Sequence, residues 1–343
     1  MSKINRINDG VTTDRFESSG FDHLEFYCLD AKSVMRSLKV GLGFEIVSTS
    51  MHETGNHIYT SYVLRTGIMK WVVTAPYLAD KSHPKMDCPH PDFKPDFVKE
   101  WVNKHGNGVA VIGIEVKDAK KAFEQATGVG EPADSGEWAK PHVSPMKVEE
   151  EGVEGYCIIS EVFVYGDTIV RFIQKEGFKG EFLPGYKDAK DEYPLNYGLR
   201  RQDHVVGNVW NMDEAVNNIK KWFGYHTFAK FSKEDIQTEW TSLNSEVLSN
   251  NDSTVLLPIN EPVKHKRQSQ IEEYLIANNG PGVQHIALFT NEVLDTIGQM
   301  RKVSHMGGFE FIPTPSEYYK DDEIIKRMDK YLTPEAQKTA IEY

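Results

Sequence analysis

The sequence predicts an α+β protein in which one unit, a strand followed by a helix and further strands, occurs four times. Two repeats in the chain lead to this prediction. The residues around His23 recur around His204, and the residues around Gly108 recur around Gly282. The two matching blocks are separated by similar lengths of chain in each copy. Internal similarity of this kind indicates a duplicated architecture.

The duplication divides the chain into two homologous halves, which we place at residues 21–192 and 193–343. Residues 1–20 mix basic and acidic side chains and lack the apolar stretch of a secretory signal. We expect this segment to be a loose leader.

Each half divides again, because a short strand runs four times into an Asp or Asn that precedes a helical pattern. Such side chains accept hydrogen bonds from the free N–H groups of a first helical turn. The four predicted caps are Asp30, Asp118, Asp213 and Asn291. After the first cap, apolar residues at helical spacing form the stripe of a helix that covers a sheet: Ala31, Val34, Met35 and Leu38. Glycines predict where the four helices end: Gly41, Gly128, Gly224 and Gly307.

The segments that follow the helices are rich in β-branched and aromatic residues, which favour strands. Residues 59–64 and 71–74 are predicted to form a hairpin in the first unit. Residues 157–165 and 168–175 are predicted to form another in the second unit. The stretch 81–97 contains four prolines and is predicted to be a loop.

The composition excludes several classes of protein. A net charge of −12, from 39 basic and 51 acidic residues, argues against a nucleic-acid partner, because phosphate binding needs a basic face. No apolar run approaches the roughly 20 residues that span a bilayer, so no membrane segment is predicted. Three scattered cysteines are too few for a disulfide framework. A reducing compartment fits best, and we expect a cytoplasmic protein.

Two histidines occupy matching positions in the C-terminal half, each on the first strand of its own unit. Because side chains alternate between the faces of a strand, His204 shares a face with Val206 and Asn208. By the same rule, His285 shares a face with Ala287. Pairing of the two strands would bring both histidines to one cavity, where imidazole suits Fe, Zn or Ni alike. We therefore predict that His204 and His285 are metal ligands.

The N-terminal half lacks one of these histidines. Its equivalent positions are His23 and Val111. This difference predicts a working site in the C-terminal half alone. We expect His23 to be a structural residue of the core or its rim.

Six groups of residues, in order along the chain, resemble the 4-hydroxyphenylpyruvate dioxygenase family of the vicinal oxygen chelate superfamily. They are residues 21–30, 62–65 with 74–77, 105–109, 203–208, 257–262 and 282–287. The resemblance covers nearly all of residues 21–320. It implies the glyoxalase-like fold of that superfamily, whose βαβββ modules match the four predicted units.

The resemblance implies a non-haem Fe(II) dioxygenase that holds its metal with two histidines and one carboxylate. His204 and His285 match the two histidine ligands of the family. Enzymes of the family convert 4-hydroxyphenylpyruvate and O2 to homogentisate in tyrosine catabolism, by oxidative decarboxylation, ring hydroxylation and side-chain migration. A homodimer is the usual assembly that the family implies.

Three further positions match residues that handle the substrate in the family: Ser245, Asn260 and Gln270. From the residues alone, Ser245 and Asn260 lie on strands that flank a turn and can meet in a hairpin. A capping box at residues 269–272 predicts that Gln270 lies in the first turn of a helix. Gln284 adjoins a predicted ligand, but strand alternation places it on the opposite face, so it is not predicted to belong to the site.

The third ligand of the family is a glutamate on a strand near the C-terminus, followed by a helix that closes the site. The C-terminal half shows no such strand before Tyr343. Glu310, Glu317 and Glu342 are present, but none lies in a strand pattern. We therefore expect an incomplete last module, a third ligand beyond Tyr343, and no activity from the 343-residue chain by itself.

Two other functions stay open at this point. Hydroxymandelate synthase uses the same metal and substrate but hydroxylates the benzylic carbon, and the sequence around Asn260 is more similar to the dioxygenase. A non-catalytic ligand-binding protein of the same fold would explain the missing glutamate, although not the two retained histidines.

Overall fold

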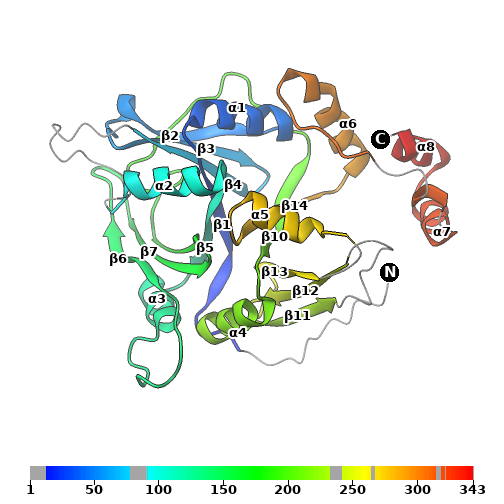
Figure 1. Ribbon diagram of the computed structural model, residues 1–343. Coiled ribbons are helices and arrows are strands. Elements are labelled where there is room, and N and C mark those ends of the chain that lie inside the picture. The colour runs from blue at the N-terminus through cyan, green and yellow to red at the C-terminus, as the bar shows by residue number, and fades with distance from the viewer. Residues whose placement is uncertain are drawn as a thin grey trace.

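The structure is a computed structural model that describes residues 13–77, 90, 92–231, 242–263, 267–313, 318–320 and 322–342. Each half is built on one sheet (Figure 1). The N-terminal half contains β1 (Ser18–Tyr27), α1 (Ala31–Leu42), β2 (Glu45–Ser50), β3 (Tyr59–Thr66), β4 (Met69–Pro76), α2 (Pro95–His105), β5 (Gly108–Val116), α3 (Ala119–Thr127), β6 (Pro141–Val148), β7 (Tyr156–Tyr165), β8 (Thr168–Glu176) and β9 (Lys187–Asp188). The C-terminal half contains β10 (Leu199–Asn208), α4 (Met212–Phe223), β11 (His226–Phe231), β12 (Ser242–Ser249), β13 (Leu256–Val263), α5 (Gln270–Ala277), β14 (Gly282–Thr290), α6 (Val293–Val303), α7 (Asp322–Tyr331) and α8 (Pro334–Glu342).

The strand pairing repeats between the halves. The nine-stranded sheet has the order β6-β7-β8-β5-β1-β4-β3-β2-β9, and the five-stranded sheet has the order β11-β12-β13-β10-β14. In each sheet the first strands of the two units pair antiparallel, as β1 with β5 and β10 with β14. The first and last strands of a unit pair parallel, as in β1 with β4 and β10 with β13. The predicted α+β fold with four units is confirmed.

The fourth unit differs from the other three. It contains β14 and α6, and the described residues after Val303 form two short 3-10 turns and the helices α7 and α8, without a strand. In the N-terminal half, β5 pairs with β8 on the edge away from β1. Among the described residues, the equivalent edge of β14 has no paired strand.

Two of the four predicted helix caps are confirmed. The Asp30 carboxylate accepts from the Ser33 N–H, and the Asp118 carboxylate accepts from the Lys121 N–H. The other two predictions are wrong, because Asn211 caps α4 in place of Asp213, and α6 follows Glu292 rather than Asn291.

Two of the predicted helix ends are also confirmed, at Gly128 and Gly224, which adopt the left-handed conformation. Gly41 instead lies inside α1, which ends at Gly43. Gly307 follows a 3-10 turn rather than α6 itself. The end of the proline-rich stretch also differs from the prediction, because α2 begins at Pro95, a residue whose fixed φ suits the first turn.

The expected leader divides into two parts. Residues 1–12 lie outside the described residues, whereas Phe16 is buried and β1 begins at Ser18. The Arg15 N–H donates to the Phe223 carbonyl at the end of α4. Residues 13–17 therefore connect the two halves.

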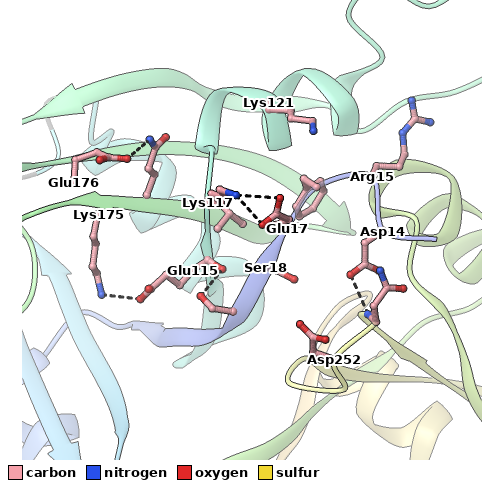
Figure 2. A pocket seen from close by; sticks show the side chains of 15 residues that line it. Asp14, Arg15, Glu17, Ser18, Glu115, Lys117, Lys121, Lys175, Glu176 and Asp252 are labelled. Atoms are coloured by element: carbon pink, nitrogen blue, oxygen red, sulfur yellow. Dashed lines mark hydrogen bonds and ion pairs between the residues drawn. The ribbon is translucent and has the colours of Figure 1, made fainter. Parts of the chain in front are cut away.

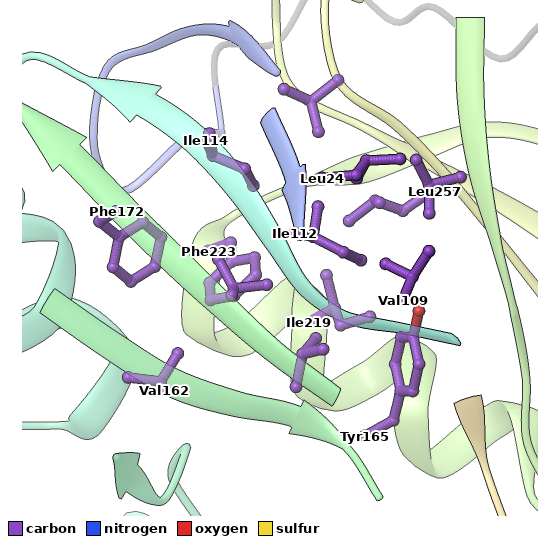
Figure 3. Close-up of a cluster of buried hydrophobic side chains, with 14 of the residues drawn as sticks. Leu24, Val109, Ile112, Ile114, Val162, Tyr165, Phe172, Ile219, Phe223 and Leu257 are labelled. Carbon is purple, nitrogen blue, oxygen red and sulfur yellow. The ribbon is translucent and has the colours of Figure 1, made fainter. Parts of the chain in front are cut away.

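The largest apolar core is continuous across the halves. Figure 3 shows Leu24 and Ile112 of the N-terminal half in one cluster with Ile219, Phe223 and Leu257 of the C-terminal half. Because apolar side chains of both sheets share this core, the halves form one packed body. In the part of the chain that the structure describes, no helix has the length and apolar character that crossing a lipid bilayer requires.

Candidate metal and substrate site

The two predicted histidine ligands lie on neighbouring strands. In the antiparallel pairing of β10 with β14, His204 is opposite Ala287 and His285 is opposite Val206. Both rings therefore stand on the same face of the sheet as diagonal neighbours. Their centroids are 6.0 Å apart, with ring planes inclined by 74°. The structure thus brings His204 and His285 together, as the repeat predicted.

Each histidine is held by the residue that precedes it. An oxygen of Asp203 lies 3.1 Å from His204 Nδ1, and Gln284 Oε1 lies 2.7 Å from His285 Nδ1. A ring that donates its Nδ1–H in this way presents the lone pair of Nε2. Metal-binding histidines are usually oriented by such a second hydrogen bond.

Gln284 corrects an expectation from strand alternation. The pairing of β10 and β14 skips Gln284, which is the extra residue of a β-bulge. The bulge breaks the alternation, so the side chain reaches its neighbour instead of turning to the opposite face. Gln284 therefore contacts a predicted metal ligand.

The electrostatics favour neutral imidazole at one of the two positions. Burial lowers the pKa of His285, and the nearby His204 ring lowers it further. Neutral imidazole is the form that binds a metal ion. The donor set of two oriented imidazoles on one face therefore fits a metal such as Fe(II).

A third protein ligand is not found in the described part of the chain. No third His, Cys, Asp or Glu there completes a ligand group. Glu310 is exposed, Glu317 lies outside the described residues, and the side chain of Glu342 also lies outside them. The open edge of β14 is next to both histidines.

The N-terminal half contains an arginine where its sheet is closed by β8. Arg171 of β8 is opposite Gly113, the β5 counterpart of Ala287. Its guanidinium donates to His23 Nε2 at 3.0 Å. His23 is fully buried, with its Nδ1 2.6 Å from Asp22. The expectation of a structural role for His23 is confirmed.

Arg171 takes two carboxylates as partners. It lies 2.7 Å from Glu25 and 2.6 Å from Glu161, and all three side chains are buried. A fixed cation thus occupies the N-terminal position that corresponds to the predicted metal position of the C-terminal half.

The predicted substrate residues Ser245 and Asn260 are neighbours. Ser245 on β12 is directly opposite Asn260 on β13, which is in turn opposite Asn208 on β10. The other face of this sheet carries apolar residues that pack with α4, such as Ile259. Since side chains alternate, the three polar residues share the face that bears His204. We call this surface the site face.

The third predicted substrate residue lies on a helix. Gln270 is the first residue of α5, and the Ser269 hydroxyl accepts from the Glu272 N–H at 3.2 Å, as the capping box predicted. The helix contacts β13 and β10. Gln270 is exposed, and no hydrogen bond among the described residues links it to Ser245 or Asn260.

Two clefts lie in different parts of the molecule. A cavity of about 400 Å³ between the halves is lined by His285, Gln284 and α5, and by α2 and β5 of the other half. Figure 2 shows a larger cleft of about 690 Å³ near β1 and α3, in which Lys117 pairs with Glu17 and Lys175 with Glu115. The larger cleft contains none of the predicted site residues.

Several curated relatives of the chain carry the same name. 4-Hydroxyphenylpyruvate dioxygenase of Plectranthus scutellarioides is 40% identical, over 92% of this chain and 70% of that protein. The enzymes of Daucus carota and Arabidopsis thaliana are each 38% identical, over 92% and 97% of this chain and 70% and 74% of their own. The chain belongs to the 4-hydroxyphenylpyruvate dioxygenase family. A scan against family models found no match.

Solved structures agree with this dioxygenase family in fold. A triple mutant of 4-hydroxymandelate synthase from Streptomyces coelicolor superposes with a TM-score of 0.72 at 20% identity, over 95% of this chain and 83% of that one. A fusion of a xylose isomerase-like barrel with a 4-hydroxyphenylpyruvate dioxygenase gives a TM-score of 0.60 at 18% identity, over 95% of this chain and 46% of the fusion. The fold is that of the vicinal oxygen chelate proteins.

Proposed function

We propose that the protein is an Fe(II)-dependent dioxygenase that converts 4-hydroxyphenylpyruvate and O2 to homogentisate in tyrosine catabolism. The observation that carries the proposal is the pair His204 and His285, side by side with oriented rings, in a chain whose relatives bear the dioxygenase name. Fe(II) bound there would supply the activation of O2 and of the α-keto acid.

On the site face, different residues would bind the metal and the substrate. His204 and His285 would hold the metal, to which the keto acid of the substrate binds. Ser245 and Asn260 would hold the aromatic end by hydrogen bonds, and Gln270 would complete this set from α5. A hydrogen-bonding residue that orients a reacting molecule contributes to the rate by positioning.

We propose that the third ligand is a carboxylate on a strand that pairs with the open edge of β14. The internal symmetry supports the position, since Arg171 is opposite Gly113 in the N-terminal half. The equivalent residue would be opposite Ala287, next to both histidines. Three protein ligands on one face leave positions for substrate and O2.

The test is O2 uptake with 4-hydroxyphenylpyruvate by Fe(II)-loaded protein that includes the strand carrying the proposed third ligand, with the product identified by mass spectrometry. Homogentisate is the expected product, and residues 1–343 by themselves should form none. 4-Hydroxymandelate would instead support the synthase, to which the solved fold is similar. Binding of the keto acid without O2 uptake would support a ligand-binding protein.

The substrate residues are tested with Asn260→Ala. We expect this variant to keep its iron while kcat/KM falls by an amount equivalent to about 1–3 kcal/mol, the value of an unpaired buried partner. Loss of iron with unchanged kinetics per bound iron would show that Asn260 supports the structure instead.

We propose a cytoplasmic location and a homodimer. Free, buried Cys28 and Cys157 support a reducing compartment, and burial raises the pKa of each thiol to about 12. The family supports the dimer. Light scattering on the eluting protein gives its mass, and a monomer would contradict the assembly.

A further inference from the structure

Asn208 is a buried polar residue on the site face of the C-terminal half. It ends β10 and is fully buried. Its Oδ1 accepts a hydrogen bond from Asn260 Nδ2 at 3.3 Å, but its own Nδ2 has no hydrogen-bond partner among the described residues. A buried donor without an acceptor destabilises the fold. On the site face, such a donor is available to a ligand that enters the site.

Asn208 lies on the site face beyond the two histidines. It lies four residues beyond His204, with no bulge of β10 between them, so the two side chains share a face. His285 is opposite Val206, so Asn208 lies about 13 Å along the strand from His204 and about 7 Å from the level of His285. If the keto acid binds at His204, the 4-hydroxyl group at the other end of the substrate points toward Asn208 and Asn260.

We infer that Asn208 and Asn260 form a pair of amides that recognises the 4-hydroxyl group, which makes Asn208 a specificity-determining residue. Their mutual hydrogen bond uses one N–H of Asn260 Nδ2 and one lone pair of Asn208 Oδ1. Asn260 Oδ1 is a further acceptor, and Asn208 Nδ2 is a donor without a partner among the described residues. A phenolic hydroxyl donates one hydrogen bond and accepts another. One hydroxyl can therefore donate to Asn260 Oδ1 and accept from Asn208 Nδ2.

This inference rests on the proposed function and adds a discrimination to it. A site whose buried polar groups pair with a hydroxyl rejects the analogue that lacks it, because those groups are then left unpaired. Phenylpyruvate is that analogue. The quantity to measure is the ratio of the affinities for 4-hydroxyphenylpyruvate and phenylpyruvate. A general loss of protein stability changes both affinities by the same factor and leaves this ratio unchanged.

The experiment is anaerobic calorimetry on Fe(II)-loaded protein that includes the strand carrying the proposed third ligand, titrated separately with 4-hydroxyphenylpyruvate and with phenylpyruvate. We expect the wild-type protein to prefer the hydroxylated acid, and Asn208→Ala to reduce the ratio of affinities about tenfold. Asn208→Leu, which fills the volume better, gives the same readout if the alanine variant folds poorly. The iron content of both variants should equal that of the wild type.

The matched control is Asn250→Ala. Asn250 is also fully buried in this half, but its Nδ2 bonds Ser18 Oγ at 3.1 Å and Thr254 Oγ1 at 2.8 Å, in the turn between β12 and β13. This variant should lose stability and keep the wild-type ratio.

Two results would overturn the inference, and only the second would also overturn the proposed function. An unchanged ratio in the Asn208 variants, with both acids still bound, would overturn it and leave the function standing. A wild-type protein that binds neither acid would overturn the proposed function as well.

Discussion

Asp203 and Gln284 reach the histidines beside them because each is the extra residue of a β-bulge. In a regular strand, consecutive side chains point to opposite faces and cannot meet. The N-terminal half has the same arrangement, where the pairing of β1 with β5 skips Asp22 and its carboxylate lies 2.6 Å from His23. Orientation of the histidine is therefore a property of the repeated unit, and the halves differ in what the ring then binds.

The ligand assignment predicts opposite effects for two histidines. His204→Ala should abolish Fe(II) binding, because it removes one of two imidazole donors on the site face. His23→Ala should retain iron and lose stability, because it removes a buried hydrogen-bond partner of Asp22 and of Arg171. Iron content by mass spectrometry and thermal melting separate the two. Stoichiometric iron in His204→Ala would refute the assignment.

Loss of the Asp203 carboxylate should weaken Fe(II) binding without abolishing it. Asp203→Ala should leave both imidazoles in place but weaken Fe(II) affinity about 10–100-fold, as the loss of an orienting partner does at other metal sites. Titration with Fe(II) under anaerobic conditions measures the affinity. Asp252→Ala, in the turn between β12 and β13, is the control and should bind iron like the wild type.

Among these residues, the proximity of His204 and His285 was predictable because the repeat compares two copies of one strand pair. Gln284 was not, since a bulge leaves no mark in the alternation that the sequence shows. Asn208 was placed on the correct face, but its importance depends on an unpaired Nδ2, which is visible only in the packed structure.

The start of α4 shows the limit of prediction for an element. Asn211 and Asp213 are both good caps, two residues apart. The structure selects Asn211 because the Met212 N–H, free in a first turn, donates to Glu261 of β13 at 3.0 Å. This partner is remote in sequence. The caps Asp30 and Asp118 were predictable because each has no competing cap beside it.

The cap assignment makes a paired prediction. Asn211→Ala should lower the free energy of unfolding by about 1 kcal/mol, the usual value of an N-cap, because the Glu214 N–H loses its acceptor. Asp213→Ala, on the same turn, should change it by less. Urea unfolding of the two variants measures the difference, and equal losses would contradict the assignment of the cap.

For the whole molecule, the fold class and the duplicated halves followed from the repeats. The continuous core did not, because patterning within a unit says nothing of which units share a core. The buried ionic network around Arg171 was also unforeseen. It crosses β1, β7 and β8 through Glu25 and Glu161.

This network predicts sensitivity to acid. Burial alone would raise the pKa of Glu161, but Arg171 and His90 hold it well below its ordinary value of 4.5. A carboxyl group with a lowered pKa in the folded state stabilises the protein above its unfolded pKa, and this stability is lost as pH falls below it. We expect the free energy of unfolding to decrease steeply below about pH 4.5, as measured by urea unfolding at a series of pH values.

A substitution tests the source of that sensitivity. Arg171→Met should cost about 3–5 kcal/mol at neutral pH, because it removes the buried cation that Glu25 and Glu161 share. The free energy of unfolding should then fall less at low pH, since Arg171 no longer favours the ionised form of Glu161. Lys117→Met, which breaks an exposed pair with Glu17, is the control. It should change neither the stability at neutral pH nor its decrease at low pH. An unchanged acid profile in Arg171→Met would refute this explanation.

The guanidinium of Arg171 is covalently part of the chain, whereas a metal ion must be acquired and can be taken away. The N-terminal half carries its own permanent counterion for Glu25 and Glu161. We therefore expect iron starvation or a chelator to loosen β10 and β14 while β1, β5 and β8 keep their amide protection in hydrogen exchange. In an iron-depleted molecule, the N-terminal half would therefore stay folded. The C-terminal half could then bind iron again while packed against it.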